Sequence, residues 1–166
     1  KRQEYEYLKN IDADMCLVIA YGQIIPESFL NLTKKGFINI HASLLPKYRG
    51  AAPIQRAIMN LEKKTGISIM KINSQLDEGP VCKSYEIDIN EKDSSDDLSE
   101  KLSDLAVEKI LDDIDDILDD KAKFKDQDHS KATYAKKINK KESSIDWNTP
   151  ATVSYTHLTL PTTYGV

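Results

Sequence analysis

The sequence predicts an α/β fold built around a largely parallel sheet. Apolar runs of strand length recur along the chain, and segments with apolar residues at helical spacing lie between them. Strands that alternate with helices are typical of domains in which helices cover a mostly parallel sheet. Ligands of such sheets bind beyond the carboxyl ends of the strands. The loops that follow the predicted strands are therefore where we expect a functional site.

The first predicted strand spans residues 15–20, a continuous apolar run. Because it lacks polar alternation, we expect it to be buried on both faces. Residues 4–9 read as the end of a helix that precedes it. A short helix is expected over residues 26–32, opened by Pro26, since the start of a helix tolerates proline. The second strand is expected at residues 37–41.

The second half of the chain continues this alternation. Residues 51–61 place their apolar side chains on one side of a predicted helix. Residues 66–72 alternate with period two and predict a strand, and residues 81–89 form a fourth strand candidate. The clearest helix spans residues 96–120, where leucine and isoleucine recur at threes and fours. Its opposite face is acidic, and we interpret that face as solvated surface.

The composition excludes several classes of protein. The 166 residues fit one domain, and 40% hydrophobic with 30% charged residues indicates a folded, soluble chain. No apolar run approaches the roughly 20 residues that span a membrane. Two distant cysteines argue against a disulfide framework or a zinc site and fit a reducing compartment. We therefore expect a cytoplasmic protein without a metal, and the net charge of −4 does not by itself indicate nucleic-acid binding.

Polar side chains at the strand ends are the candidate chemistry. Asn39 and His41 stand two residues apart, which places them on one face of their strand. Asp77 follows the third strand, in the run Leu-Asp-Glu-Gly-Pro. An amide donor, a titratable ring and a carboxylate are the parts needed for acyl transfer to an amine, because the tetrahedral oxygen needs donors and a proton must move between two nitrogens.

Each of these residues also has a purely structural interpretation. A histidine at a strand end is often a satisfied structural residue, an asparagine there caps backbone, and aspartate before glycine forms turns. The loops at residues 21–26, 41–50 and 73–80 must converge for the three side chains to meet. No Gly-x-Ser-x-Gly elbow or phosphate loop is present. The three histidines, His41, His129 and His157, show no metal-ligand spacing.

Residues 39–55 resemble the signature of folate-dependent formyltransferases. The run is Asn-Ile-His-Ala-Ser-Leu-Leu-Pro-Lys-Tyr-Arg-Gly-Ala-Ala-Pro-Ile-Gln, and its last six residues are most similar to the branch that acts on methionyl-tRNA. Further similar stretches follow in one collinear order between residues 8 and 153, at residues 20–26, 65–70, 76–79, 132–138 and 145–147. Several separate motifs agree, so the resemblance is specific.

The resemblance implies transfer of a formyl group from 10-formyltetrahydrofolate to the amino group of initiator methionyl-tRNA. It assigns catalysis to Asn39, His41 and Asp77. Asn39 and protonated His41 would stabilise the oxyanion, and His41, oriented by Asp77, would move the proton. The cofactor-binding residues that it implies are Gly22, Gln23, Ile24, Ile25, Ser43, Leu44, Leu45, Pro46, Leu76 and Gly79.

Two other functions stay open from the sequence. Related formyltransferases act on a nucleotide sugar or on glycinamide ribonucleotide, and they share the Asn-x-His and the later aspartate. A folate-binding module without catalysis is the alternative from another class, although binding alone does not require all three polar residues. Arg49 either braces its loop or meets an anion.

The resemblance also implies a domain organisation. Residues 1–130 would be the C-terminal part of a Rossmann-like formyltransferase domain, and the chain alone is expected to be inactive. Residues 131–153 would be a basic linker toward a β-barrel domain absent from this chain, and residues 154–166, which do not resemble the family, a non-native tail. The full-length protein is expected to be monomeric. Lysines of the linker either solubilise it or contact tRNA phosphates: Lys131, Lys136, Lys137, Lys140 and Lys141.

Overall fold

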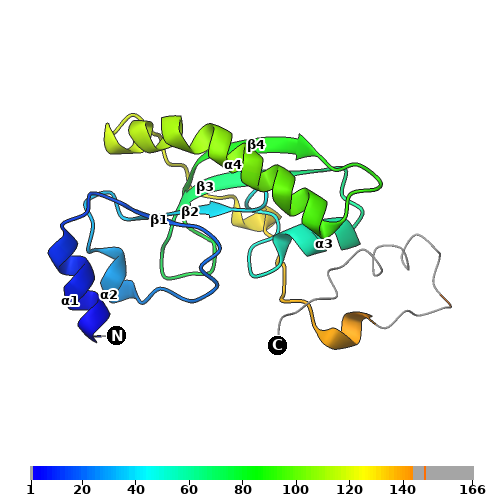
Figure 1. Ribbon diagram of the computed structural model, residues 1–166, viewed down its shortest axis with the longest axis horizontal. Coiled ribbons are helices and arrows are strands. Elements are labelled where there is room, and N and C mark those ends of the chain that lie inside the picture. Colours follow the sequence, from blue (N-terminus) through cyan, green and yellow to red (C-terminus); the bar gives the residue numbers. More distant parts are fainter. Residues whose placement is uncertain (1, 144–147, 149–166) are drawn as a thin grey trace.

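Four strands form one mixed sheet in the order β1-β2-β3-β4 (Figure 1). The computed structural model describes residues 2–143 and Asn148, so the expected linker beyond residue 143 and the expected tail at residues 154–166, with His157, lie outside the described residues. The strands are β1 (Cys16–Val18), β2 (Phe37–His41), β3 (Lys64–Lys71) and β4 (Val81–Asp88).

The prediction of a largely parallel sheet is wrong. Only β1 and β2 pair in parallel, whereas β2 with β3 and β3 with β4 are antiparallel. A parallel connection needs a crossover of a dozen or more residues, usually a helix that crosses the sheet. The loop from β3 to β4 is too short for that, and the helix between β2 and β3 does not carry the chain back to the other end of the sheet. The architecture remains α/β.

The helices lie close to their predicted positions. The long helix α4 follows a capping box in which Ser94 accepts a hydrogen bond from the backbone of Asp97. The expected short helix at residues 26–32 is reduced to a single turn after Pro26. No helix of the described residues is long and apolar enough to cross a membrane. The helices are α1 (Arg2–Ile11), α2 (Glu27–Leu30), α3 (Pro53–Met59) and α4 (Ser95–Leu118), with 3-10 turns η1 (His129–Lys131) and η2 (Lys140–Ser143).

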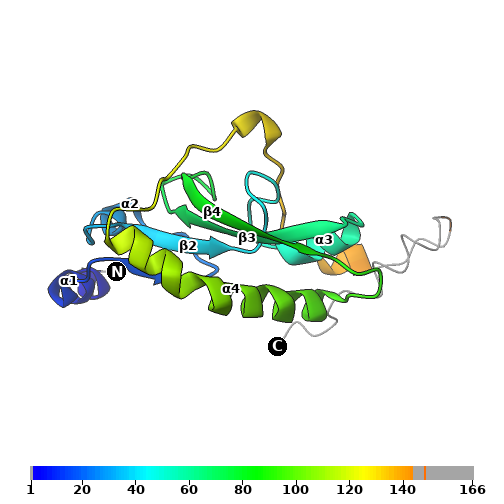
Figure 2. The same ribbon diagram turned by 90° about the horizontal axis from the view of Figure 1, so that it is seen from above.

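The side chains of β2 alternate between a face that packs on α4 and a face that carries the polar residues. Ile40 packs with Leu98 and Leu102 of α4, and Ile38 packs in a second cluster that includes Ile117 of the same helix. Figure 2 shows α4 along one face of the strands, while the segment that follows it, residues 121–132, crosses to the other side. Since successive side chains of a strand point to opposite faces, the residues of β2 that alternate with the isoleucines face away from α4.

Two strands differ from their expected burial. The residues of β1 are only partly buried, because β1 is an edge strand whose one partner is β2. The expectation that this run is buried on both faces is therefore wrong. In β3, by contrast, every residue from Thr65 to Met70 is buried. Gly66 has no room for a side chain, because a Cβ atom there would collide with the carbonyl of Tyr85.

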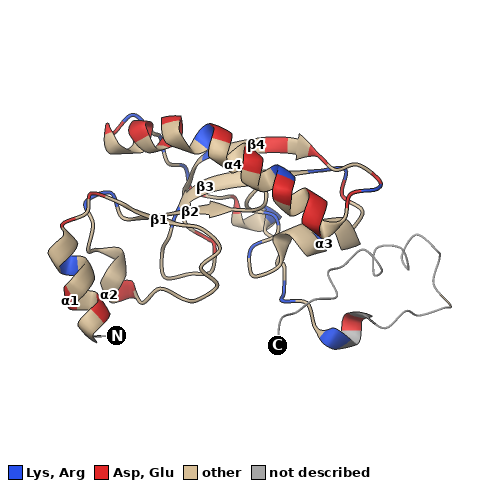
Figure 3. Ribbon diagram, viewed as in Figure 1, with Lys and Arg blue, Asp and Glu red and all other residues tan. Residues whose placement is uncertain are grey.

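The acidic face of α4 is solvated, with one buried exception (Figure 3). Asp113 is 1% exposed, accepts a hydrogen bond from the Tyr85 hydroxyl at 3.0 Å and lies 2.6 Å from the Lys83 ammonium. The hydrogen bond to Asp113 raises the pKa of Lys83, and burial raises the pKa of Tyr85. These two contacts tie α4 to the middle of β4.

Replacing Asp113 by asparagine is expected to lower the free energy of unfolding by about 1–2 kcal/mol, because it removes the buried carboxylate charge that pairs with the partly exposed Lys83 and accepts from Tyr85. Asp112→Asn is the matched control, since Asp112 is exposed on the neighbouring position of the same helix. Urea unfolding midpoints of the two variants measure the difference. Equal midpoints would show that Asp113 does not hold α4 on the sheet.

Candidate active site

His41 ends β2 on the face opposite α4, and its tautomer is set by the backbone. The ring is buried, and Nε2 lies 2.8 Å from the carbonyl oxygen of Tyr48. Because a carbonyl only accepts hydrogen bonds, Nε2 carries a proton and donates it. The neutral ring therefore has its lone pair on Nδ1. This second nitrogen is directed at Asp77, whose Oδ2 lies 3.8 Å away.

Asp77 is held where its carboxylate faces the ring. Its Oδ2 accepts a hydrogen bond of 2.8 Å from the backbone amide of Gly50, and the side chain is 17% exposed. The gap to His41 Nδ1 is too long for a direct hydrogen bond. The carboxylate nevertheless compensates the positive charge that the ring acquires when Nδ1 is protonated.

Two of the three predicted loops, residues 41–50 and 73–80, do converge. The physical reason differs from the predicted one, because β3 is antiparallel to β2. The loop after β3 starts near Ile38, at the far end of β2 from His41, and folds back across the sheet. The convergence of these two loops was thus predicted from an incorrect argument about strand direction.

Asn39 lies on the same face as His41 and is half-buried. Within the part of the chain that the structure describes, no hydrogen bond engages its side-chain amide. Among the described residues, the one sealed side-chain polar atom without a partner is Oγ of Ser95, so the amide of Asn39 is open to water or to a ligand. Asn39 thus offers a side-chain N–H donor that has no partner among the described residues. It stands beside a ring that can take up a further proton only at Nδ1.

Tyr48 is a structural anchor of the site that sequence reasoning did not single out. Its φ of 60° turns its carbonyl toward His41, a conformation that costs energy for a residue other than glycine. The hydroxyl donates to Glu62 at 2.7 Å and accepts from Asn60 at 2.9 Å. Burial raises the pKa of the phenol to about 12, so it stays a donor at neutral pH.

The expected cofactor loop at residues 43–46 is fixed to β3. The hydroxyl of Ser68 donates a hydrogen bond of 2.7 Å to the carbonyl of Ser43 and accepts one of 3.0 Å from the amide of Leu45. The hydroxyl of Ser43 itself donates to the carbonyl of Lys47. The side chain of Ser43 therefore shapes the loop. Ser68, in the middle of a buried strand, gave no signal in the sequence beyond being polar between apolar neighbours.

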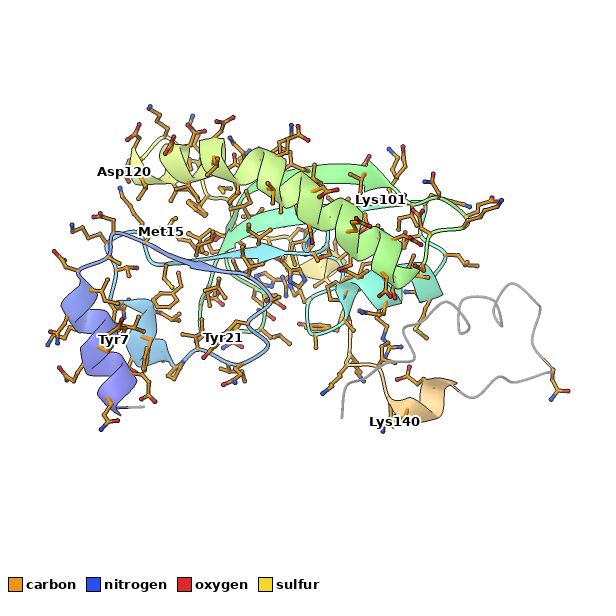
Figure 4. The ribbon with its side chains drawn as sticks, viewed as in Figure 1. Tyr7, Met15, Tyr21, Lys101, Asp120 and Lys140 are labelled. Carbon is orange, nitrogen blue, oxygen red and sulfur yellow. The ribbon has the colours of Figure 1, made fainter. Side chains whose placement is uncertain are left out.

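Among the described residues, the third predicted loop, after β1, forms no hydrogen bond or ion pair with this cluster. Gly22 has a φ of 68° with open space around it, Gln23 is exposed, and the side chain of Ile24 is 89% exposed. Figure 4 shows Tyr21 on the same loop, and it too is exposed. Leu76 is likewise 57% exposed. These side chains present apolar surface on the described part without contributing to the core.

Gly79 and Arg49 have structural explanations. A Cβ atom at Gly79 would collide with the carbonyl of Lys71, so glycine is required where the loop returns to β3. Arg49 is 1% exposed and forms an ion pair of 3.0 Å with Glu78. Of the two interpretations of Arg49, this geometry favours the loop brace. Its guanidinium also donates to the side-chain oxygen of Gln127 and lies 3.3 Å from Nδ1 of His129. No motif in the sequence pointed to Gln127.

Replacing Tyr48 by phenylalanine is expected to lower the free energy of unfolding by about 1 kcal/mol, because the two hydrogen bonds of the hydroxyl are lost. The loss stays this small because both former partners are open enough to bond to water instead. Tyr7→Phe is the control, since Tyr7 is 69% exposed in α1. Urea unfolding measures both. A Tyr48→Phe variant as stable as the control would mean that the hydroxyl does not anchor the loop that carries the His41 acceptor.

The chain is similar to known proteins in both sequence and fold. The family model described as Formyl transferase matches residues 1–114. Over 147 residues the chain is 62% identical to methionyl-tRNA formyltransferase of Pelagibacter ubique, a match that covers 89% of this chain and 47% of that protein. The chain thus spans about half the length of the curated relatives it matches.

Solved structures show the same fold. Methionyl-tRNA formyltransferase from Clostridium thermocellum superposes with a TM-score of 0.77 at 21% identity, covering 96% of this chain and 68% of that one. A sugar N-formyltransferase from a Shewanella species gives a TM-score of 0.80 at 21% identity and covers 96% of this chain and 64% of that one. With more than two thirds of its residues matched by the family model, the chain belongs to the formyl transferase family.

Proposed function

We propose that this chain carries the catalytic site of an enzyme that transfers a formyl group from 10-formyltetrahydrofolate to the amino group of initiator methionyl-tRNA. One observation carries the catalytic part of this proposal. On one face of β2, the uncommitted amide of Asn39 stands beside His41, whose Nε2 is fixed by a carbonyl and whose Nδ1 faces a carboxylate. The acceptor is supported by the 62% identity to methionyl-tRNA formyltransferase of Pelagibacter ubique.

The reaction needs one carbon–nitrogen bond to form and one to break. The acceptor amine attacks the formyl carbon, and the carbonyl oxygen becomes an oxyanion. The amide of Asn39 stabilises that charge, together with the ring of His41 once its Nδ1 has taken up the proton of the amine. The proton lost by the amine is returned to N10 of the folate as the second bond breaks, which leaves tetrahydrofolate and a formylated amine. In this scheme Nδ1 of His41 exchanges the proton, and Asp77 compensates its charge.

The proposed folate site lies along the expected cofactor residues. Ile24 and Leu76 carry exposed apolar side chains that suit a flat aromatic ring. Gly22, Gln23 and Ile25 would supply backbone groups from the loop after β1, and Leu44, Leu45 and Pro46 from the loop held by Ser68. Ser43 and Gly79 would act by keeping these loops in shape.

Three other functions have weaker support. Transfer to a nucleotide sugar is consistent with the fold likeness to the Shewanella sugar N-formyltransferase, but a likeness at 21% identity concerns the fold alone. Glycinamide ribonucleotide as acceptor has no specific observation in its favour. A folate-binding module without catalysis would not need a histidine whose tautomer is fixed and whose second nitrogen faces a carboxylate.

The expected surroundings of the site stay predictions. These are a Rossmann-like catalytic part up to residue 130, a basic linker over residues 131–153, a monomeric full-length protein and a cytoplasmic location. The start of the expected linker pairs with the active-site loop, since the amide of Arg49 donates to the carbonyl of Thr133 and the amide of Ala135 to the carbonyl of Arg49.

Formyl transfer is tested in a completed protein, in which this chain is joined to the remaining segments of the Pelagibacter ubique relative. We expect transfer to charged initiator tRNA in preference to a nucleotide sugar amine or glycinamide ribonucleotide. His41→Ala should lower kcat at least 100-fold with folate binding retained, because oxyanion stabilisation and proton transfer are both lost. Preference for a sugar amine, or unchanged turnover in the variant, would reject the proposal.

Lys136 and Lys137 are the proposed tRNA contacts of the basic segment. Their side chains are exposed, while their carbonyls accept hydrogen bonds from Arg56, so α3 fixes the backbone that presents them. Lys131 is paired with Asp128, and the side chain of Lys141 lies outside the described residues. Lys140 lies in η2, where Figure 4 labels it.

Replacing Lys136 and Lys137 by alanine should reduce the slope of log K against log salt for tRNA binding by about 1–2, because each phosphate contact contributes nearly one unit. The control is the pair Lys92→Ala and Lys123→Ala, which removes the same charge from exposed positions elsewhere. Filter binding over a range of salt concentrations gives the slopes. Identical slopes for both pairs would mean that the segment only solubilises the chain.

A further inference from the structure

Gln127 is a buried polar residue that the catalytic scheme does not use. It is 8% exposed and comes from the segment after α4, on the side of the sheet away from that helix (Figure 2). Its amide nitrogen donates a hydrogen bond of 2.8 Å to the carbonyl of Asp77 and another of 2.7 Å to the carbonyl of Gly79. Its amide oxygen accepts from Arg49 at 3.1 and 2.8 Å. Both hydrogens and the oxygen of the side chain are thus engaged.

The contact with Asp77 acts on a strained residue. Asp77 has a φ of 50°, a left-handed conformation that is unfavourable for a residue other than glycine and persists only where neighbours enforce it. Gln127 holds the carbonyl of Asp77, and the amide of Gly50 holds its carboxylate. Two bonds on opposite ends of one residue fix the direction of its Cα–Cβ bond, and hence the place of the carboxylate against His41.

Gln127 also joins the two converged loops. Arg49, which donates to Gln127, directly precedes Gly50, which donates to Asp77. The guanidinium pairs with Glu78 in the other loop, so the amide lies between two chain segments that must keep their distance. An amide is the one side-chain group that accepts from an arginine and donates twice to carbonyls at the same time.

The segment that carries Gln127 is itself fixed at both ends. The backbone of Lys125 exchanges two hydrogen bonds of 2.9 Å with Val81 at the start of β4. On the other side, Ala135 is buried and its amide donates to the carbonyl of Arg49. Gln127 therefore reaches the active-site loops from a backbone whose place does not depend on Gln127 alone.

We propose that Gln127 is a positioning residue for formyl transfer, which holds the backbone of Asp77 so that its carboxylate faces Nδ1 of His41. The inference rests on the proposed function for its kinetic consequence and on the described contacts for its structural one. It extends the active site to a residue 13 positions beyond the part matched by the family model, which ends at residue 114.

Two substitutions separate positioning from bracing. Gln127→Glu keeps an oxygen for Arg49 but has no hydrogen to donate to the carbonyls of Asp77 and Gly79, whereas Gln127→Ala loses both functions. If Gln127 positions Asp77, both variants of the completed protein lower kcat on the order of 10- to 100-fold, with KM for folate and tRNA changed less than twofold. Asp126→Asn, an exposed neighbour, is the control and should retain the parental kcat.

The second readout needs no activity. Hydrogen exchange of the Gly50 amide reports on its bond to the Asp77 carboxylate, and the Ile69 amide, in the core of β3, reports on global unfolding. We expect Gly50 to exchange faster in both variants while Ile69 stays protected. If the Gln127→Ala variant does not fold, Gly50 exchange in the Gln127→Glu variant alone decides whether Gln127 positions Asp77.

The outcomes distinguish this inference from the proposed function. Parental kcat and parental Gly50 exchange in a folded Gln127→Glu variant would overturn the positioning role and leave only a brace for Arg49. If the parent transfers no formyl group to any acceptor, the proposed function fails. Gly50 exchange then still decides whether Gln127 positions Asp77.

Discussion

The hydrogen bond from His41 Nε2 to the carbonyl of Tyr48 is the constraint on which the site depends. It leaves the lone pair of the neutral ring on Nδ1, and it does so with a backbone group whose charge does not change with pH. That carbonyl points at the ring because Tyr48 is held in a left-handed conformation by its own hydroxyl and by Thr133. The chemistry of one imidazole thus depends on contacts made up to 85 residues away in sequence.

A second organising feature is the alternation along β2. The isoleucines on one side bind the strand to α4, and the polar residues on the other side face the loops. Stability and chemistry therefore act on opposite faces of the same five residues. The buried position of β3 next to it completes this arrangement, since Ser68 reaches across to hold the loop after His41 while its neighbours Ile67 and Ile69 stay in the core.

Much of this was predictable from local patterns. The bounds of β2 and the extent of α4 follow from apolar periodicity and capping, and the polar ends of strands pointed to Asn39, His41 and Asp77. The direction of β3 was not predictable, because an apolar strand carries no local mark of parallel or antiparallel pairing. Gln127 was missed for a related reason. It lies 50 residues from Asp77, in a polar stretch without periodicity, and only the folded backbone shows that it is buried.

The pairing of residues 133–135 with the loop around Arg49 has a consequence for synthesis of the chain. The strands and the proposed catalytic residues are complete once residue 88 has been made, but the segment that fixes their loops follows only after the whole of α4. During translation the sheet and its helix are present before the active-site loops acquire their final contacts. The contacts of these loops with residues 133–135 can form only after that segment has been made. A nascent chain paused before residue 127 would contain Asn39, His41 and Asp77 but not the later residues whose contacts hold their loops in place.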